Sequence, residues 1–293
     1  MLSLALALIS GLAWGSADFV GGVMTKRLTP ATVLVVSQAA GLTFIGVLVV
    51  ASGDPVPPSR SLVYGALGGL AGAIGLAALY KGLAVGRMSI VAPTAALSGA
   101  VPVIVGFLQS ERPALLQLVG MAVAGVGVLV AVRTPDPRAV LPGDASETAG
   151  RSPRAGMTRG IGYALGAALF LGLFVTSLDA AGDASAVWAS LMIRAVSVPL
   201  FFAAWLLMRS DRRRPTVSEL WLLVVVGMLD NGANVLFALA ADRGLLTLVA
   251  VLGSLYPVST VLLARAFLRE RLTGTQAAGV VAAFTGVALI AVG

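Results

Sequence analysis

The chain contains neither cysteine nor histidine, and only 11% of its 293 residues are charged. Without cysteine, disulfides, thiolate metal sites and thiolate nucleophiles are excluded. Without histidine, a proton relay through side chains has no imidazole and depends on carboxylates. The sequence also lacks a glycine-rich phosphate loop that ends in Lys-Ser or Lys-Thr. We therefore expect no bound metal, no cofactor and no nucleotide-driven motor.

Apolar residues are abundant instead, at 58% of the chain, and the mean hydropathy is +0.97. A helix that crosses a bilayer needs about 20 mostly apolar residues, because lipid offers no partner for unpaired backbone groups. Ten such stretches with so few charges cannot all be buried in a soluble helical core of this length. The predicted spans cover residues 2–24, 31–51, 62–81, 88–109, 114–132, 160–177, 186–208, 219–240, 245–267 and 274–292.

The basic residues predict the orientation in the membrane. Sixteen of the twenty lysines and arginines lie in alternate gaps between spans, and the other gaps hold only Arg60, Arg112 and Arg243. Because basic loops stay in the cytoplasm, both termini should lie outside. The positive charge is then a topology signal, and we expect no nucleic-acid partner. No basic residue precedes the first span, so it is predicted to be a retained helix and not a cleaved signal.

The two halves of the chain resemble each other at an offset of 155 to 159 residues. This offset pairs Gln38 with Arg194 and Pro102 with Pro257, and Gln117, Gly120 and Gly127 with Gln276, Gly279 and Gly286. Each half contains an odd number of spans, so the second half enters the membrane the other way up. We predict an all-α polytopic membrane protein with two inverted repeats, 1–132 and 160–293, joined by a hydrophilic cytoplasmic linker, 133–159. Inverted repeats place a binding site near the midplane and open it to either side in turn.

Several short elements resemble those of the drug/metabolite transporter superfamily, and specifically its EamA-type ten-helix exporters. They are Trp14-Gly15-Ser16 in the first span, prolines in the fourth and ninth, and acidic turns before the fifth and tenth. A basic residue midway along a repeat's second helix is also typical, and Arg194 fits. Two features depart from the pattern: the turns Ser-Glu-Arg and Arg-Glu-Arg lack the usual glycine, and many relatives keep their termini in the cytoplasm. The resemblance covers essentially the whole chain and implies a transporter of a bacterial or archaeal plasma membrane.

Charged and amide side chains at membrane depth are the main site candidates, because a charge there costs at least about 2.5 kcal/mol. Asp18 either binds a proton or a substrate ammonium, or pairs with Lys26 near the headgroups. Asp230, with Asn231 and Asn234, either lines a substrate cavity or bonds a neighbouring helix. Arg194 either holds a substrate anion or, as the resemblance implies, is a structural counter-ion for Asp18 or Asp230. Proton coupling through Asp18 or Asp230 is a hypothesis.

Other residues of the predicted spans complete the list of candidates. We assign to the substrate cavity Trp14, Ser16, Tyr80, Thr94, Ser98, Ser254 and Tyr256. Tyr80 is also a candidate interfacial anchor beside Lys81. We assign to hinges Pro93, Pro102 and Pro257, because proline frees a carbonyl one turn back. Glu111 and Glu270 are interpreted as ion-pair partners of the adjacent arginines.

The sequence therefore predicts a secondary transporter and no enzyme. The expected activity is export of a small polar metabolite, such as an amino acid or related amphipathic compound, by alternating access, in a monomer or homodimer. Two alternatives stay open: a sugar or nucleotide-sugar uniporter or exchanger, and a non-transporting scaffold or lipid-handling protein. An intramembrane protease using Asp18 and Asp230 is disfavoured, because their flanks carry no protease signature.

Overall fold

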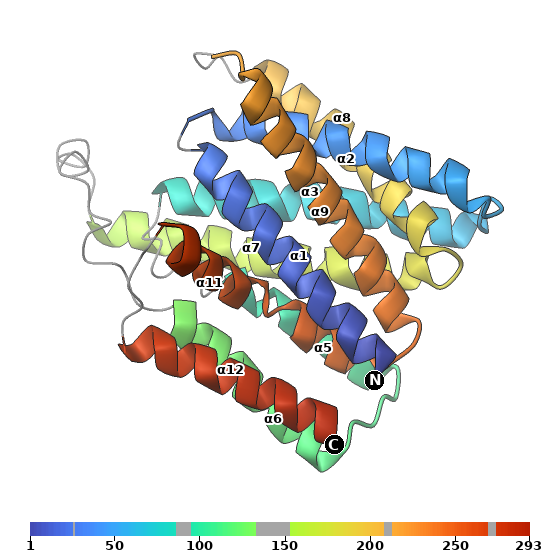
Figure 1. Ribbon diagram of the computed structural model, residues 1–293, viewed down its shortest axis with the longest axis vertical. Helices are drawn as coiled ribbons and strands as arrows, with labels where there is room; N and C mark the ends of the chain where they lie inside the picture. The colour runs from blue at the N-terminus through green and yellow to red at the C-terminus, as the bar shows by residue number, and fades with distance from the viewer. Residues whose placement is uncertain (26, 86–94, 133–152, 208–212, 269–273) are drawn as a thin grey trace.

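The structure is a computed structural model that describes residues 1–25, 27–85, 95–132, 153–207, 213–268 and 274–293 (Figure 1). Within these ranges every regular element is a helix. In chain order the elements are α1 (Leu2–Thr25), α2 (Pro30–Ser52), α3 (Ser59–Val85), the 3₁₀ helix η1 (Ala96–Gly99), α5 (Ala100–Leu108), α6 (Leu115–Val132), α7 (Pro153–Gly182), α8 (Ala186–Leu207), α9 (Val217–Ala241), α10 (Leu246–Gly253), α11 (Tyr256–Leu268) and α12 (Gly274–Val292).

Seven of these helices are long and apolar enough to cross a membrane, namely α1, α2, α3, α7, α8, α9 and α12. Three shorter apolar helices cover Leu97–Leu108, Leu115–Ala131 and Leu246–Thr260, within the predicted fourth, fifth and ninth spans. Many large apolar side chains stay exposed on the helix surfaces, where a bilayer would cover them. The expectation of an all-α polytopic fold is confirmed.

α7 is longer at both ends than its predicted span, 160–177. It begins at Pro153, inside the segment expected to be a linker, and it ends at Gly182. The predicted span ends before Asp179. In the structure Asp179 occupies the last turn of the helix, where such a group can reach water. Residues 133–152 lie outside the described part of the chain.

The predicted ninth span is two helices and not one. α10 ends at Gly253, and α11 begins at Tyr256. Pro257 lies in the first turn of α11, where its missing N–H breaks no helical hydrogen bond, whereas a continuous helix would lose one there. At the interruption the Ser254 N–H donates to the Ala250 carbonyl at 2.9 Å, and the Ser254 hydroxyl donates to the Val251 carbonyl at 2.7 Å.

The fourth span is also irregular within its described residues. The 3₁₀ helix η1 leads directly into α5, and Pro102 lies buried in the first turn of α5. A methyl group added to Gly99 at this junction would lie 3.1 Å from Cβ of Ser254. The irregular parts of the fourth and ninth spans therefore lie against each other. The hinge candidate Pro93 lies outside the described residues.

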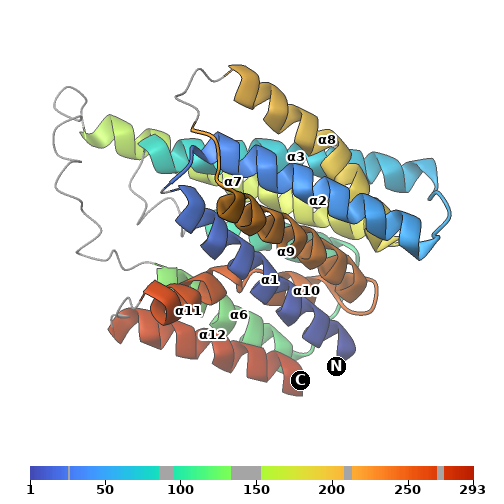
Figure 2. The same ribbon diagram turned by 45° about the horizontal axis from the view of Figure 1, so that its top comes forward.

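α6 and α12, the last helices of the two repeats, lie side by side (Figures 1 and 2). The carbonyl of Gly286 lies against Gly120, and the carbonyl of Gly279 lies against Gly127. These are the glycines that the sequence offset pairs, Gly120 with Gly279 and Gly127 with Gly286. When each residue is replaced by its counterpart in the other repeat, the Gly120–Gly286 contact becomes the Gly279–Gly127 contact, and the reverse. This is the geometry of an inverted repeat, since antiparallel helices related by a two-fold axis meet in this way.

The other helix contacts show the same symmetry between the repeats. α1 packs on α9 as α7 packs on α3, and α2 packs on α8. Both chain ends lie on one face of the bundle, which we call the termini face (Figures 1 and 2). There Ser3 lies against Gly244, and Gly293 lies against Leu116 and Gln117.

Candidate functional site

A buried polar network joins α2, α8 and α9 near the middle of these helices. Arg194, only 6% exposed, uses all three guanidinium nitrogens for contacts within the protein. Nε donates to Oδ1 of Asn231 at 2.9 Å, Nη2 donates to Oδ2 of Asp230 at 2.5 Å, and Nη1 donates to Oε1 of Gln38. A guanidinium engaged in this way has no free pair of N–H groups for bidentate binding of a substrate carboxylate. The geometry favours the counter-ion interpretation of Arg194.

The acids and amides around Arg194 are also partnered with one another. Nε2 of Gln38 donates to Oδ2 of Asp230 at 3.3 Å, and Nδ2 of Asn231 donates to the Gly227 carbonyl at 2.9 Å. The Asp230 side chain is 23% exposed. Of the two carboxylates considered as partners of Arg194, Asp230 is the one that pairs with it.

Asn234 faces α1, one turn along α9. Nε1 of Trp14 donates to Oδ1 of Asn234 at 3.0 Å, and the Trp14 ring lies 5.5 Å from the ring of Phe237. Ser10 donates to the Ala233 carbonyl at 2.8 Å nearby. Nδ2 of the fully buried Asn234 has no hydrogen-bond partner in the described part of the protein. Trp14 and Asn234 are thus held in the α1–α9 contact.

Asp18 differs from Asp230 in its surroundings. Its side chain is exposed, and Asp230 and Tyr256 are near enough to interact with it electrostatically. Among the described residues Asp18 has no cationic partner. Lys26, its expected partner, lies outside them.

The remaining predicted residues are dispersed. The Ser16 hydroxyl donates to the Leu12 carbonyl at 2.7 Å. Ser98 is buried in η1, and Tyr256 is half-buried at the start of α11. Thr94 and the side chain of Tyr80 lie outside what the structure describes.

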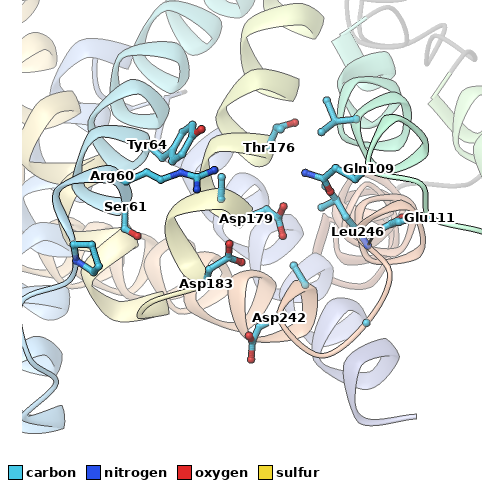
Figure 3. A pocket seen from close by; sticks show the side chains of 15 residues that line it. Arg60, Ser61, Tyr64, Gln109, Glu111, Thr176, Asp179, Asp183, Asp242 and Leu246 are labelled. Carbon is cyan, nitrogen blue, oxygen red and sulfur yellow. Dashed lines mark hydrogen bonds between the residues drawn. The ribbon is translucent and has the colours of Figure 1, made fainter.

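A polar pocket that these candidates do not line is drawn in Figure 3. It lies at the termini face, since Gly244, one of its lining residues, lies against Ser3. Its volume is about 580 Å³, and its walls come from both repeats: α3 and α5 from the first, and α7, α9 and α10 from the second. The polar side chains that line it belong to Arg60, Ser61, Tyr64, Gln109, Glu111, Thr176, Asp179, Asp183 and Asp242.

Glu111 is the pocket residue with the strongest structural role. Its Oε1 accepts a hydrogen bond from the Leu246 N–H at 2.6 Å, and its Oε2 accepts one from the Thr247 N–H at 2.9 Å. Arg112 instead donates to the Glu111 backbone carbonyl. The expected Glu111–Arg112 ion pair is therefore wrong. The free N–H groups at the start of α10 compete better for the carboxylate than an exposed arginine does.

The other charges of the pocket are less engaged. The Arg60 guanidinium lies 5.5 Å from the centre of the Tyr64 ring, and Asp242 pairs with Arg243 at 3.4 Å. In the turn after α7, partial burial and the charge of Asp242 raise the pKa of Asp183, and the charge of Arg60 opposes the rise. Carboxylates outnumber cations here, so the pocket attracts positive charge.

This pocket is not among the sites predicted from the sequence, although two signals point to it. Asp179 and Asp183 stand one helical turn apart, and Arg60 is one of only three basic residues in the gaps predicted to lie outside. Arg60 was interpreted as a loop charge, but it belongs to the first turn of α3.

Residues 1–133 and 158–292 each match the EamA-like transporter family. The chain belongs to this family. In fold, the EamA-like protein is similar to a protein of known crystal structure, with 19% sequence identity, a TM-score of 0.77, and coverage of 98% of this chain and 94% of the other. A comparison with curated protein sequences finds no match. The family assignment makes the chain a multi-pass membrane transporter of the drug/metabolite transporter superfamily, with a lipid bilayer around it and a small molecule as its substrate.

Proposed function

We propose that this EamA-like protein is a secondary active transporter that exports a small polar metabolite, such as an amino acid or a related amphipathic compound. The observation that most supports this proposal is the polar pocket of about 580 Å³ between the two repeats at the termini face. The positive-inside rule places that face outside the cell. A pocket that reaches water from one face, between inverted repeats, is what one state of an alternating-access carrier requires.

The symmetry of the contacts supports a rocking motion. If the two repeats exchange conformations, a contact between two residues is replaced by the contact between their counterparts in the other repeat. Gln38 and Arg194 are counterparts of each other, so the exchange leaves their contact unchanged and it can be kept in both states. The Glu111 contact with the start of α10 joins unmatched residues and belongs to the termini face only. Gln38 and Arg194 thus lie where a pivot would be.

The pocket chemistry bears on the alternatives. A nucleotide sugar carries phosphates, which the carboxylates of the pocket would repel. A neutral sugar has no charged group that could pair with these charged side chains. A scaffold or lipid-handling protein does not require a water-accessible polar pocket between its repeats. The small polar metabolite is the class that the pocket favours.

Proton coupling is part of the proposal, and Asp18 is its centre. A proton on Asp230 would neutralise the carboxylate that pairs with Arg194 and accepts a hydrogen bond from Gln38. Asp18 is exposed and has no cationic partner among the described residues. Proton binding at Asp18 therefore displaces no ion pair.

Flux in proteoliposomes tests the function and the coupling. Purified protein should move a metabolite identified by thermal stabilisation, and an imposed pH gradient should drive that flux. Asp18→Asn should abolish the dependence on the gradient, whereas Asp144→Asn in the hydrophilic segment should not. If Asp18→Asn and Asp230→Asn both retain the wild-type dependence, proton coupling through these residues is wrong. If no metabolite crosses, the transporter proposal is wrong.

A further inference from the structure

The pocket at the termini face contains charges of both signs that the protein itself does not pair. Arg60 contacts the ring of Tyr64, and its guanidinium makes no hydrogen bond or ion pair within the described residues. The Asp179 carboxylate makes none there either. By contrast, Glu111 is occupied by two backbone N–H groups, and Asp242 is paired with Arg243.

These unpaired groups face the same space. Figure 3 shows the Arg60 guanidinium, from α3, and the carboxylates of Asp179 and Asp183, from α7 and the turn after it, converging on the centre of the pocket. The amide of Gln109 points inward from the opposite wall (Figure 3). Arg60 belongs to the first repeat and Asp179 to the second, so a ligand that touches both bridges the repeats.

A cation and an anion that share a cavity without closing an ion pair leave room for a group of the opposite sign at each. Arginine binds carboxylates and other planar anions through its fork, and an aromatic ring under the guanidinium holds the fork in place. A half-buried carboxylate beside a second one favours an ammonium group. The volume of about 580 Å³ is within the range of small-molecule sites.

We infer that this pocket binds a dipolar metabolite, one that carries both an ammonium and an anionic group, with the anion at Arg60 and the ammonium at Asp179. The assignment rests on the proposed transport function and names the substrate class and its two anchors. Asp183 strengthens the negative end. Tyr64 positions Arg60.

Four compounds with one hydrocarbon skeleton and different charges test the assignment. They are leucine (dipolar), leucinamide (cationic), 4-methylpentanoate (anionic) and 4-methylpentanamide (neutral). The readout is the concentration of each that gives half of the maximal thermal stabilisation of the full-length protein in detergent. A ligand without one of the two charged groups should bind about tenfold more weakly than leucine, or worse. Leucine should therefore bind best and 4-methylpentanamide worst.

Two variants each remove the side-chain charge that is proposed to bind one charged group of the ligand. Arg60→Gln should weaken leucine about tenfold and leave leucinamide unchanged, because leucinamide has no carboxylate for Arg60 to bind. Asp179→Asn should weaken leucine by a similar factor and leave 4-methylpentanoate unchanged. The matched control is Arg112→Gln, which removes an exposed arginine outside the pocket on the same face and should change no affinity. Arg60→Lys and Asp179→Glu should retain part of the affinity, which separates a defect in binding from a defect in folding.

Several results would overturn the assignment: stabilisation by none of the four compounds, equal stabilisation by all of them, or wild-type leucine affinity in Arg60→Gln and Asp179→Asn. Leucine flux in proteoliposomes, measured in parallel, separates this failure from failure of the transport function. If wild type and both variants carry leucine equally well, the carrier stands and its anchors lie elsewhere. If the wild type carries no metabolite at all, the transport function itself fails.

Discussion

Gln38 and Arg194 occupy matched positions in the two repeats, and their side chains contact each other. Two matched residues can touch only where the pseudo-two-fold axis passes between them. Gly99 and Ser254, the matched residues of the irregular fourth and ninth spans, also lie against each other. The axis therefore runs through the polar network of Arg194 and through the crossing of the irregular helices. The one buried arginine among the described residues is thus located where the repeats must stay in register.

Removing Arg194 should destabilise the protein strongly. Arg194→Gln leaves the largely buried Asp230 without its cation, and breaking a buried pair from one side costs about 3–5 kcal/mol. The double variant Arg194→Gln/Asp230→Asn should recover a large part of that stability, because it removes the orphaned charge. The measurement is the free energy of unfolding by titration with a denaturing detergent.

The control for Arg194 is an exposed pair. Arg243 and Asp242 are 44% and 49% exposed, and such a pair contributes about 1 kcal/mol at most. Arg243→Gln should therefore change the free energy of unfolding little. A double variant no more stable than Arg194→Gln alone would show that the destabilisation comes from packing and not from the charge of Asp230.

The glycine contact between α6 and α12 predicts a sharp positional effect. A methyl group on Gly127 would lie 2.3 Å from the backbone nitrogen of Ala283, whereas a methyl group on Gly125, in the same helix, meets nothing within 4 Å. Gly127→Ala should therefore cost about 1–3 kcal/mol, since overpacking moves the backbones apart. Gly125→Ala should be neutral in the same unfolding titration. Equal effects of the two substitutions would contradict the close approach.

The architecture could be predicted from the sequence because two independent signals agree on it. Hydropathy locates the spans, and the offset that pairs Gln38 with Arg194 identifies the repeats without information on contacts. Both signals are local or linear along the chain. Neither reports how far apart two matched helices lie, so the offset could not indicate which matched residues meet at the axis.

The pocket was missed for a related reason. The apolar run ends before Asp179, so hydropathy assigned this residue to a loop, although the helix continues for another turn. Arg60 was counted only as a topology signal. Both residues line a cavity because α3, α5, α7, α9 and α10 meet around it. Which helices meet there depends on packing between segments far apart in the sequence, and local composition does not encode it.

Glu111 should stabilise the start of α10 across the repeat boundary. Glu111→Ala removes the acceptor for two backbone N–H groups and should cost about 1–2 kcal/mol, as the removal of an N-terminal cap does. Glu111→Gln retains one acceptor oxygen and should cost less. Arg112→Gln, next to it and exposed, should stay within about 0.5 kcal/mol of wild type. Unfolding titrations that rank Arg112→Gln above Glu111→Ala in cost would restore the ion-pair interpretation.

Asp183 should make stability depend on pH in an unusual direction for a carboxylate. Partial desolvation and the charge of Asp242 raise the pKa of Asp183 in the folded protein, against the opposing charge of Arg60. The fold therefore favours protonated Asp183, and this contribution is complete below the unfolded pKa of about 3.9 and is lost as the pH rises through the folded value. Asp183→Asn mimics the protonated form. Its melting temperature should equal that of wild type near pH 4 and exceed it at neutral pH.

A second variant fixes the sign of this effect. Arg60→Gln removes the cation that lowers the pKa of Asp183, so in the Arg60→Gln background the advantage of Asp183→Asn should be larger and its transition should end at a higher pH. Thermal melts at half-unit steps between pH 4 and pH 8 would measure it. A transition that stays at the same pH would mean that Arg60 does not control the field at Asp183. An advantage of Asp183→Asn that is the same at every pH would show that it arises from packing, since only a titrating carboxylate changes its charge across this range.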